Sequence, residues 1–432
     1  MRISTVTCSF DIDQLLLKEE KIRFRYIWML ISAGCLLALL FIFNNKTKNA
    51  VTVPVVIDHN RMLVDAEMQR KNGSWRKVRL WIDTGNPEFF ISKTLAEDLG
   101  IDLTAAEKTS GETAQSLDVP PPAGVRLGGM PLNFKGVRSK VMYQPKWLFS
   151  TMHNDANLPS TVLKQYQVIF DYPESKLTLA KPGSLKPRGT RIPAGINPET
   201  GIVQIDTKID AGSFSFAIDN GASYSFVSKD ILTELSKRHA VWNKHTGALA
   251  CANIWGWWPE EPEWPLIRIP EIELGTLKIK DAGIAGIPGF FPNGMDLGEW
   301  YSLKTLRPVD GFLGPNALKA FRVEIDYINN EVYLEKGAEF DSHDMDIAGL
   351  TLRPLEDGRY QVIGIAKLEG KPAVKGVEPG DILLQIDDLK TTGATMGTVI
   401  DALRGKPGDS HILILERDGK QFRVEAKVER FL

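Results

Sequence analysis

The sequence carries one pattern twice, and this internal duplication limits the folds open to the chain more than any other feature. An apolar segment runs into Asp-Thr-Gly at 83–85, and a second apolar segment runs into Asp-Asn-Gly at 219–221. Further along each copy, residues 167–179 and 322–334 share a strand-turn-strand pattern around Asp-Tyr. Because these landmarks recur in the same order, a duplicated unit explains them better than two unrelated β-hairpins of similar composition.

Matching local signals follow each aspartate. A short apolar stretch comes next in both copies and ends, nine residues after the aspartate, in a serine, Ser92 or Ser228. A serine directly before a run of helix-forming residues is typical of a helix N-cap. We therefore predict helices over 93–99 and 229–236, in equivalent places of the two copies.

These residues resemble the aspartic peptidases of the retroviral type (retropepsin-like), with two units fused in one chain as in the pepsin-like enzymes. The resemblance covers roughly residues 52–336 and implies a mainly β fold of two duplicated lobes, each a β-barrel. It implies a monomeric catalytic unit, because both aspartates lie in one chain, and it calls for no cofactor and no metal ion. The implied catalytic residues are Asp83 and Asp219, and the implied supporting residues of the two loops are Thr84, Gly85, Asn220 and Gly221.

The chemistry of such a site follows from two neighbouring carboxyl groups. Two like charges a few ångströms apart cannot both form cheaply, so the pair retains one proton. The ionised member acts as general base on a water molecule, and the protonated member acts as general acid on the scissile carbonyl. A glycine two residues after each aspartate lets the loop turn tightly beside the substrate.

The sequence departs from the family pattern at three places. Asn220 stands where the family has a threonine whose hydroxyl links the two catalytic loops, and its amide is able to make a related bond. The family closes each site with an apolar-apolar-glycine segment, which 310–314 contains, but 158–160 reads Leu-Pro-Ser. Asn86 and Ala222 stand where a hydroxyl of the family lowers the pKa of a catalytic carboxyl. We therefore expect a working range nearer mild acid or neutral pH than that of a gastric protease.

Composition and charge fit a globular protein of several domains. A chain of 432 residues has room for about three domains, and 43% hydrophobic residues allow a sizeable core. A net charge of −2, without a basic block, argues against nucleic acid as a partner. The three cysteines, Cys8, Cys35 and Cys251, are too few for a disulfide framework.

Residues 26–43 form an apolar run that basic residues precede. As a helix, this run would extend about 27 Å, close to the roughly 30 Å hydrocarbon core of a bilayer. More basic residues precede the run than follow it, which places the tail 1–25 in the cytoplasm and the rest in the periplasm or outside the cell. We expect a single-pass signal anchor. The alternatives are a cleaved signal peptide, a lipid-modified Cys35 or a buried core helix.

The duplicated region divides into lobe one at 51–181, a linker at 182–198 rich in proline and glycine, and lobe two at 199–337. Residues 108–122 lie where the family has a flap over the cleft, and the Gly/Pro-rich stretch 283–298 is predicted to be a mobile loop beside the site. Copy two also holds clustered tryptophans. The alternatives for them are to line the substrate cleft, to cover the active site, to rest on the bilayer surface or to pack on their own domain. The five residues are Trp242, Trp255, Trp257, Trp258 and Trp264.

Residues 346–432 change character and resemble a PDZ domain (α+β) of the bacterial, circularly arranged type. The segment 378–387, which reads Glu-Pro-Gly-Asp-Ile-Leu-Leu-Gln-Ile-Asp, carries most of this resemblance. It implies that an extended peptide adds to a sheet edge and that a loop of backbone amides binds the terminal carboxylate of the peptide. The alternative is a docked structural domain that binds no free peptide. The residues at the implied peptide-binding loop are Gly349, Leu350, Thr351 and Leu352.

Three functional hypotheses follow. The first is a membrane-anchored aspartic endopeptidase whose PDZ domain recruits protein or peptide substrates. The second, motivated by Asn220 and Ser160, is a catalytically inactive peptide-binding scaffold that keeps the two-lobed fold. The third is only an anchored, β-rich protein. The third would remain if the carboxyl groups of Asp83 and Asp219 pointed into separate pockets or were salt-bridged to basic groups.

Overall fold

The structure is a computed structural model that describes residues 49–103, 108–110, 115–144, 146–149, 151–247, 249, 260–288 and 297–432. The predicted membrane segment at 26–43 and all three cysteines lie outside these residues. Within the described part of the chain, no helix combines the length and the apolar character needed to cross a membrane.

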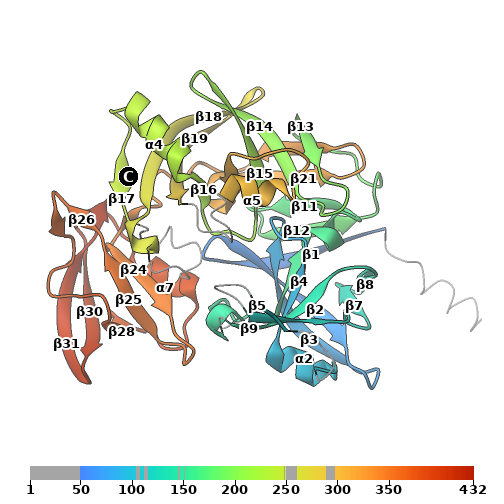
Figure 1. Ribbon diagram of the computed structural model, residues 1–432, viewed down its shortest axis with the longest axis horizontal. Coiled ribbons are helices and arrows are strands. Elements are labelled where there is room, and N and C mark those ends of the chain that lie inside the picture. Colours follow the sequence, from blue (N-terminus) through green and yellow to red (C-terminus); the bar gives the residue numbers. More distant parts are fainter. Residues whose placement is uncertain are drawn as a thin grey trace, which may run out of the picture. The chain divides into compact units, whose positions relative to one another are not determined.

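Lobe one is built almost entirely of strands (Figure 1). Its elements in chain order are β1 (Ala50–Asp58), β2 (Arg61–Gln69), β3 (Trp75–Asp83), β4 (Phe89–Ser92), α2 (Lys93–Leu99), β5 (Lys108–Ser110), β6 (Gln115–Val119), β7 (Val125–Leu127), β8 (Met130–Leu132), β9 (Ser139–Gln144), η1 (Lys146–Phe149), β10 (Ala156–Pro159), α3 (Ser160–Leu163), β11 (Gln167–Asp171) and β12 (Lys176–Ala180).

Lobe two repeats this plan with additions. Its elements are β13 (Thr190–Ile196), β14 (Val203–Ile209), β15 (Gly212–Ile218), β16 (Ser225–Ser228), α4 (Lys229–Arg238), β17 (Lys244–Thr246), η3 (Glu261–Glu263), β18 (Pro265–Leu274), β19 (Leu277–Ile287), α5 (Leu297–Ser302), β20 (Gly311–Leu313), α6 (Pro315–Leu318), β21 (Phe321–Asp326) and β22 (Glu331–Lys336).

The strand pairing confirms the duplication. In lobe one β10 runs parallel to β3 and antiparallel to β4, and in lobe two β20 runs parallel to β15 and antiparallel to β16. The predicted helices are present as α2 and α4. Ser92 and Ser228 each accept a hydrogen bond from a backbone N–H of the first helical turn. The helix α4 continues to Arg238, two residues beyond its predicted end.

One antiparallel sheet joins the lobes, in the order β1-β12-β11-β21-β22-β13. At its centre β11 and β21, the equivalent strands of the two copies, lie side by side (Figure 1). Gln167 pairs with Asp326, and Asp171 pairs with Arg322. The strand-turn-strand pattern noted in each copy therefore provides the surface through which the copies meet.

Part of the expected linker is a strand instead. Residues 190–193 pair with β22, and residues 194–196 pair with β14. Pro193 lies where β13 changes partner, and Pro54 lies at the equivalent place in β1. A proline has no backbone N–H to donate, so it is tolerated where one ladder ends and the next begins. The proline content that suggested a linker therefore reflects this change of partner.

Residues 283–287 of the expected loop at 283–298 are part of a strand instead. The strand β19 pairs with β18 as far as Ala285 and with β16 as far as Ile287, and residues 289–296 lie outside the described residues. Glycine is required at position 283 because the Tyr224 side chain packs directly against its Cα atom. A Cβ atom there would lie 1.7 Å from the hydroxyl oxygen of Tyr224. This glycine is therefore needed for packing within a strand, and the composition of the segment does not mark a loop here.

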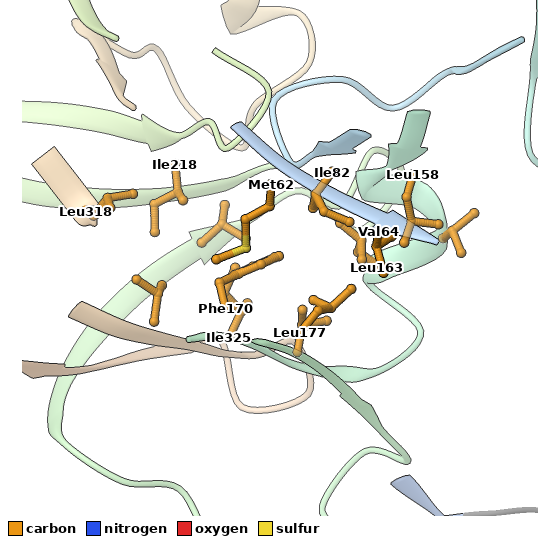
Figure 2. Packing of buried hydrophobic residues seen from close by; sticks show 14 of the residues in the cluster. Met62, Val64, Ile82, Leu158, Leu163, Phe170, Leu177, Ile218, Leu318 and Ile325 are labelled. Carbon is orange, nitrogen blue, oxygen red and sulfur yellow. The ribbon is translucent and has the colours of Figure 1, made fainter. Parts of the chain in front are cut away.

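The two loops that carry Asp83 and Asp219 rest on a single hydrophobic core. Ile82 and Ile218, the residues directly before Asp83 and Asp219, are both fully buried in it. Figure 2 shows their side chains in one cluster with those of Met62 and Phe170. Because protein interiors are packed as densely as crystals, this shared core fixes the height of one loop relative to the other.

The C-terminal unit is a smaller α+β arrangement. Its elements are β23 (Asp346–Ile347), β24 (Leu350–Pro354), β25 (Tyr360–Ile365), β26 (Lys367–Leu368), β27 (Lys371–Pro372), β28 (Ile382–Ile386), β29 (Leu389–Lys390), α7 (Met396–Leu403), β30 (Ser410–Arg417), β31 (Lys420–Lys427) and β32 (Glu429–Arg430). The main sheet has the order β24-β25-β28-β30-β31. The assignment of this unit to the PDZ family stays a prediction.

The C-terminal unit shares its core with lobe two. One buried cluster contains Phe226 and Trp264 of lobe two together with Leu350 and Leu352 of the C-terminal unit. A buried ion pair joins them as well, with 2.7 Å between Arg268 on β18 and Asp344. The unit is therefore packed against lobe two as part of one folded body.

Candidate active site

Asp83 and Asp219 meet at the junction of the two lobes. Asp83 ends β3 and Asp219 follows β15, and both are 5% exposed. A Cβ atom built on Gly221 would lie 2.4 Å from Asp83 Oδ1 and 3.2 Å from Asp219 Oδ1. Because both carboxyl oxygens lie this close to one point, the distance between them cannot exceed the sum of these two distances. A Cβ atom on Gly85 would lie 2.4 Å from Asp219 Cγ. Each carboxyl group is thus pressed against the glycine of the opposite loop.

Thr84, on the first loop, makes two hydrogen bonds to the second loop. Thr84 Oγ1 donates to the Ile218 carbonyl at 2.8 Å and accepts the backbone N–H of Asn220 at 2.9 Å. The Asn220 side chain is fully buried, and neither atom of its amide has a hydrogen-bond partner among the described residues. The related bond expected of this amide is therefore not formed. A buried polar group without a partner costs roughly 1–3 kcal/mol.

The two carboxyl groups receive different hydrogen bonds. Asp219 Oδ1 accepts the backbone N–H groups of Gly221 at 2.8 Å and Ala222 at 3.1 Å. Asp83 Oδ2 faces the side-chain amide of Asn157 at 3.5 Å, a distance at which little hydrogen bonding remains. Because hydrogen bonds from N–H groups favour a carboxylate, Asp219 is better prepared than Asp83 to carry the negative charge.

The acidity of the pair agrees with this asymmetry. Burial and the neighbouring charge of Asp219 raise the pKa of Asp83 well above its ordinary value. Burial also raises the pKa of Asp219, but the N–H groups of Ala222 and Gly221 and the charge of Arg61 oppose that rise. The two groups titrate as a pair, which holds one proton over an extended pH range. Asp83 is the preferred position for that proton.

Among the described residues, neither aspartate takes part in an ion pair within 4.0 Å. A buried cation, Arg61, is nevertheless close by. Its charge offsets part of the rise in the pKa of Asp83 and of Asp219. Tyr301 Oη donates to the Gly85 carbonyl at 2.7 Å and supports the first loop from lobe two. In the same region, burial lowers the pKa of Lys304 to about 8, and the charges of Glu88 and Asp83 offset only part of this decrease.

The segment that closes the site in lobe one is shifted by one residue from the sequence alignment. Pro159 pairs with Asp83 in the parallel ladder, whereas Leu313 pairs with Ile218. The counterpart of Gly314 is therefore Pro159 and not Ser160. Pro159 (φ −80°, ψ 163°) and Gly314 (φ −86°, ψ 174°) have nearly the same conformation, and each directly precedes a short helix. Proline suits this φ, so the position does not require glycine for its backbone.

The residues after the motif glycines do not supply a hydroxyl. Asn86 Oδ1 accepts the backbone N–H of Glu88 at 3.0 Å, while the Asn86 carbonyl accepts from Ser160. Ala222 contributes only its backbone N–H to Asp219. The pKa-lowering hydroxyl of the family therefore has no side-chain substitute at either position.

Other predicted features lie around this centre. The expected flap contains the hairpin β5–β6, whose tip at 111–114 is outside the described residues. Trp264 is buried in the core shared with the C-terminal unit, and Trp242 stacks on His239 with 3.9 Å between ring centres. Both described tryptophans of the cluster therefore have packing roles. The other three, Trp255, Trp257 and Trp258, lie outside the described residues.

The implied peptide-binding residues of the C-terminal unit lie together at the start of β24. Leu350, Thr351 and Leu352 are 0–2% exposed. A Cβ atom on Gly349 would lie 2.6 Å from the Phe431 ring, which explains the glycine by packing. The Leu350 N–H already donates to the Ala348 carbonyl at 2.7 Å. Peptide binding at this loop stays a prediction.

Three residues of the site were not identified from the sequence: Arg61, Asn157 and Tyr301. Asn157 lies directly before the predicted closing segment, so a register one residue earlier would have included it. Arg61 begins the strand β2 and Tyr301 lies in the short helix α5, each far along the chain from the loop that it contacts. No local sequence signal marks such contacts.

No protein-family model matches this sequence, and no curated protein matches it. Among solved structures, the chain is similar to the crystal structure of aspartic proteinase from Irpex lacteus. The two are 14% identical, and the match covers 67% of this chain and 98% of that chain with a TM-score of 0.39.

Proposed function

We propose that this protein hydrolyses peptide bonds as an aspartic-type endopeptidase. One observation carries the proposal: two buried carboxyl groups, from equivalent strands of a duplicated fold, meet against each other's loop glycines. Burial raises the pKa of both acids, and the charge of Asp219 raises that of Asp83 further. Neighbouring buried acids with raised pKa values and no ion pair are typical of catalytic sites. A structural role would instead favour pairing each acid with a cation.

The asymmetry of the pair assigns the two roles. Asp219, whose charge is stabilised by two backbone N–H groups, takes a proton from the attacking water. Asp83, the protonated member, gives its proton to the scissile carbonyl oxygen as the water oxygen bonds to the carbonyl carbon. The tetrahedral intermediate then breaks its C–N bond, the proton held by Asp219 passes to the leaving nitrogen, and Asp83 recovers its proton from the intermediate.

Substrate and location follow from the sequence predictions and belong to the same proposal. The substrate class is protein or extended peptide. We further propose that 26–43 anchors the chain, with the lobes and the C-terminal unit on the periplasmic or outer side. In this proposal the C-terminal unit binds a peptide of a substrate or partner along β24.

The test is cleavage of a peptide library by the purified full-length protein from acid to neutral pH, with products read by mass spectrometry. We expect cleavage between acid and neutral pH, and its loss in Asp83→Asn and in Asp219→Asn. As a matched control, Asp65→Asn removes an exposed acid that pairs with Arg79 and should leave cleavage unchanged. Cleavage that persists in both active-site variants would refute the proposal.

The unpartnered amide of Asn220 keeps a second candidate open, a peptide-binding scaffold without turnover. A statine-containing peptide separates the two, because its hydroxyl stands where the tetrahedral intermediate would form. Tight binding that is lost in Asp219→Asn favours catalysis. Binding of ordinary peptides, without turnover at any pH, favours the scaffold.

A further inference from the structure

Arg61 is a buried cation that the mechanism above does not use. It is the first residue of β2, directly after the turn that joins β1 to β2, is 8% exposed and donates from Nε to the Gly221 carbonyl at 2.6 Å. Its neighbour Asn60, in the turn, donates from Nδ2 to the Ser223 carbonyl at 2.9 Å. The end of the β1–β2 hairpin therefore binds the catalytic loop of lobe two at two carbonyl groups, on either side of Ala222.

The turn is itself held from the other side by the C-terminal unit. The Asp58 carboxylate accepts the backbone N–H of Gly397 at 3.0 Å and the hydroxyl of Thr395, at the first turn of α7. A Cβ atom on Gly397 would lie 2.5 Å from the backbone nitrogen of His59. The turn that precedes Arg61 is thus fixed between α7 and the second catalytic loop.

The charge of Arg61 faces the acids of the site. The acidic groups that act on it are, in decreasing order, Asp219, Asp58, Asp83 and Glu261. Burial lowers the pKa of Arg61 to about 10, so the guanidinium stays charged at mild acid and neutral pH. In return, its charge lowers the pKa of both catalytic acids. The other titratable groups that act on the pair or respond to its charge are Tyr172, Tyr301 and Lys304.

We propose that Arg61 is a positioning residue for the two aspartates, acting through two separable contributions. Its Nε–H fixes the Gly221 carbonyl and so the place of the Asp219 loop, and its positive charge stabilises the single negative charge that the pair carries. This inference rests on the proposed function. It explains how a pair without a hydroxyl at Asn86 or Ala222 retains an ionised member.

Three substitutions separate the contributions. Arg61→Met removes both, Arg61→Gln keeps a neutral donor, and Arg61→Lys keeps the charge with a different donor geometry. Without the charge the pKa of the general base rises, so the acid side of the pH–rate profile moves to higher pH in the Met and Gln variants. At one pH unit below the wild-type optimum, we expect kcat/KM to fall about tenfold more than at the optimum. Arg61→Lys should keep the wild-type profile with a lower kcat and a similar KM.

The matched control is Arg79→Met, which removes a half-buried arginine whose guanidinium pairs with Asp65 and leaves the dyad untouched. An activity-free readout accompanies the kinetics: a ¹³C-carboxyl NMR titration of Asp83 and Asp219 in the full-length protein, assigned with the two Asn variants. We expect the titration midpoints to move to higher pH in Arg61→Gln and to stay in place in Arg61→Lys. If the Met variant does not fold, the Gln variant carries the test.

Unchanged NMR midpoints and an unchanged pH profile in Arg61→Gln would overturn the inference, and the proposed function would stand if the Asp variants were inactive. Equal shifts in the Lys and Gln variants would overturn it too, because a charge effect distinguishes these residues. If the wild-type protein cleaves nothing, the proposed function fails, and the NMR midpoints still decide whether Arg61 stabilises the charge of the pair.

Discussion

Replacing Gly85 by alanine is the sharpest test of how the two loops fit together. The nearest approach of the added Cβ atom is 2.4 Å, to Asp219 Cγ, whereas ordinary contacts begin at 3.4 Å. The Asp219 carboxyl group or the first loop must therefore move by about 1 Å, a displacement that can cost about 100-fold in rate. This corresponds to roughly 2.7 kcal/mol of transition-state stabilisation. Gly85 does not have a positive φ, so the substitution tests the contact without adding backbone strain.

The assay is the initial rate of cleavage of a defined peptide taken from the library. We expect kcat to fall about 100-fold while KM changes little, because binding along the cleft does not depend on the dyad alone. Overpacking of this kind costs about 1–3 kcal/mol, so the protein should remain folded by circular dichroism. The control is Gly405→Ala, far from the dyad, where the added atom meets the exposed Asp409 side chain and the buried Val428 side chain, each at 3.1 Å. A folded Gly85→Ala protein with kcat within about threefold of wild type would refute the reasoning.

Three further predictions concern stability. Asn220→Thr removes a buried unpartnered amide and should raise the free energy of unfolding by about 1 kcal/mol in urea titrations; no gain would contradict the assignment. The pKa of Asp83 is raised in the folded protein, so the free energy of unfolding falls as pH rises above the ordinary aspartate pKa of 3.8. Asp83→Asn should therefore raise Tm by about 2–4 °C at neutral pH, with a smaller gain in acid. Arg268→Met removes the partner of the buried Asp344 and should lower the free energy of unfolding by about 3–5 kcal/mol. The double variant Arg268→Met/Asp344→Leu should recover most of this loss. Equal losses in the single and double variants would exclude the unpaired charge as the cause.

The sequence predicted the parts of this protein that depend on local pattern. The two Asp-x-Gly motifs, the serine caps at Ser92 and Ser228 and the paired strand-turn-strand segments are all short-range signals, and the structure contains each of them in equivalent places. A duplicated local pattern is informative because chance rarely repeats several features in order. The meeting of the two aspartates follows from this symmetry once both copies adopt the same fold.

Features set by contacts between distant segments could not be predicted. The assignment of Pro159 to the place of Gly314 depends on strand register, and a one-residue error is invisible in composition. The lack of a hydrogen-bond partner for the Asn220 amide among the described residues depends on the position of the facing loop. Arg61 reaches the site because the first hairpin folds across the lobe boundary, and nothing within that hairpin marks it. The buried surface shared by the C-terminal unit and lobe two is likewise the product of long-range packing.

The central pairing of β11 with β21 has a consequence for each half taken alone. Gln167 and Arg322 are equivalent positions of the two copies, and so are Asp171 and Asp326. Because Gln167 pairs with Asp326 and Arg322 pairs with Asp171, the strand register is the same from either copy. A self-complementary strand edge of this kind is what builds two-fold homodimers. Lobe one expressed by itself would present β11 as an open edge, and a second molecule of lobe one could take the place of β21. The fused chain thus keeps, inside one polypeptide, an interface that two identical subunits could have formed.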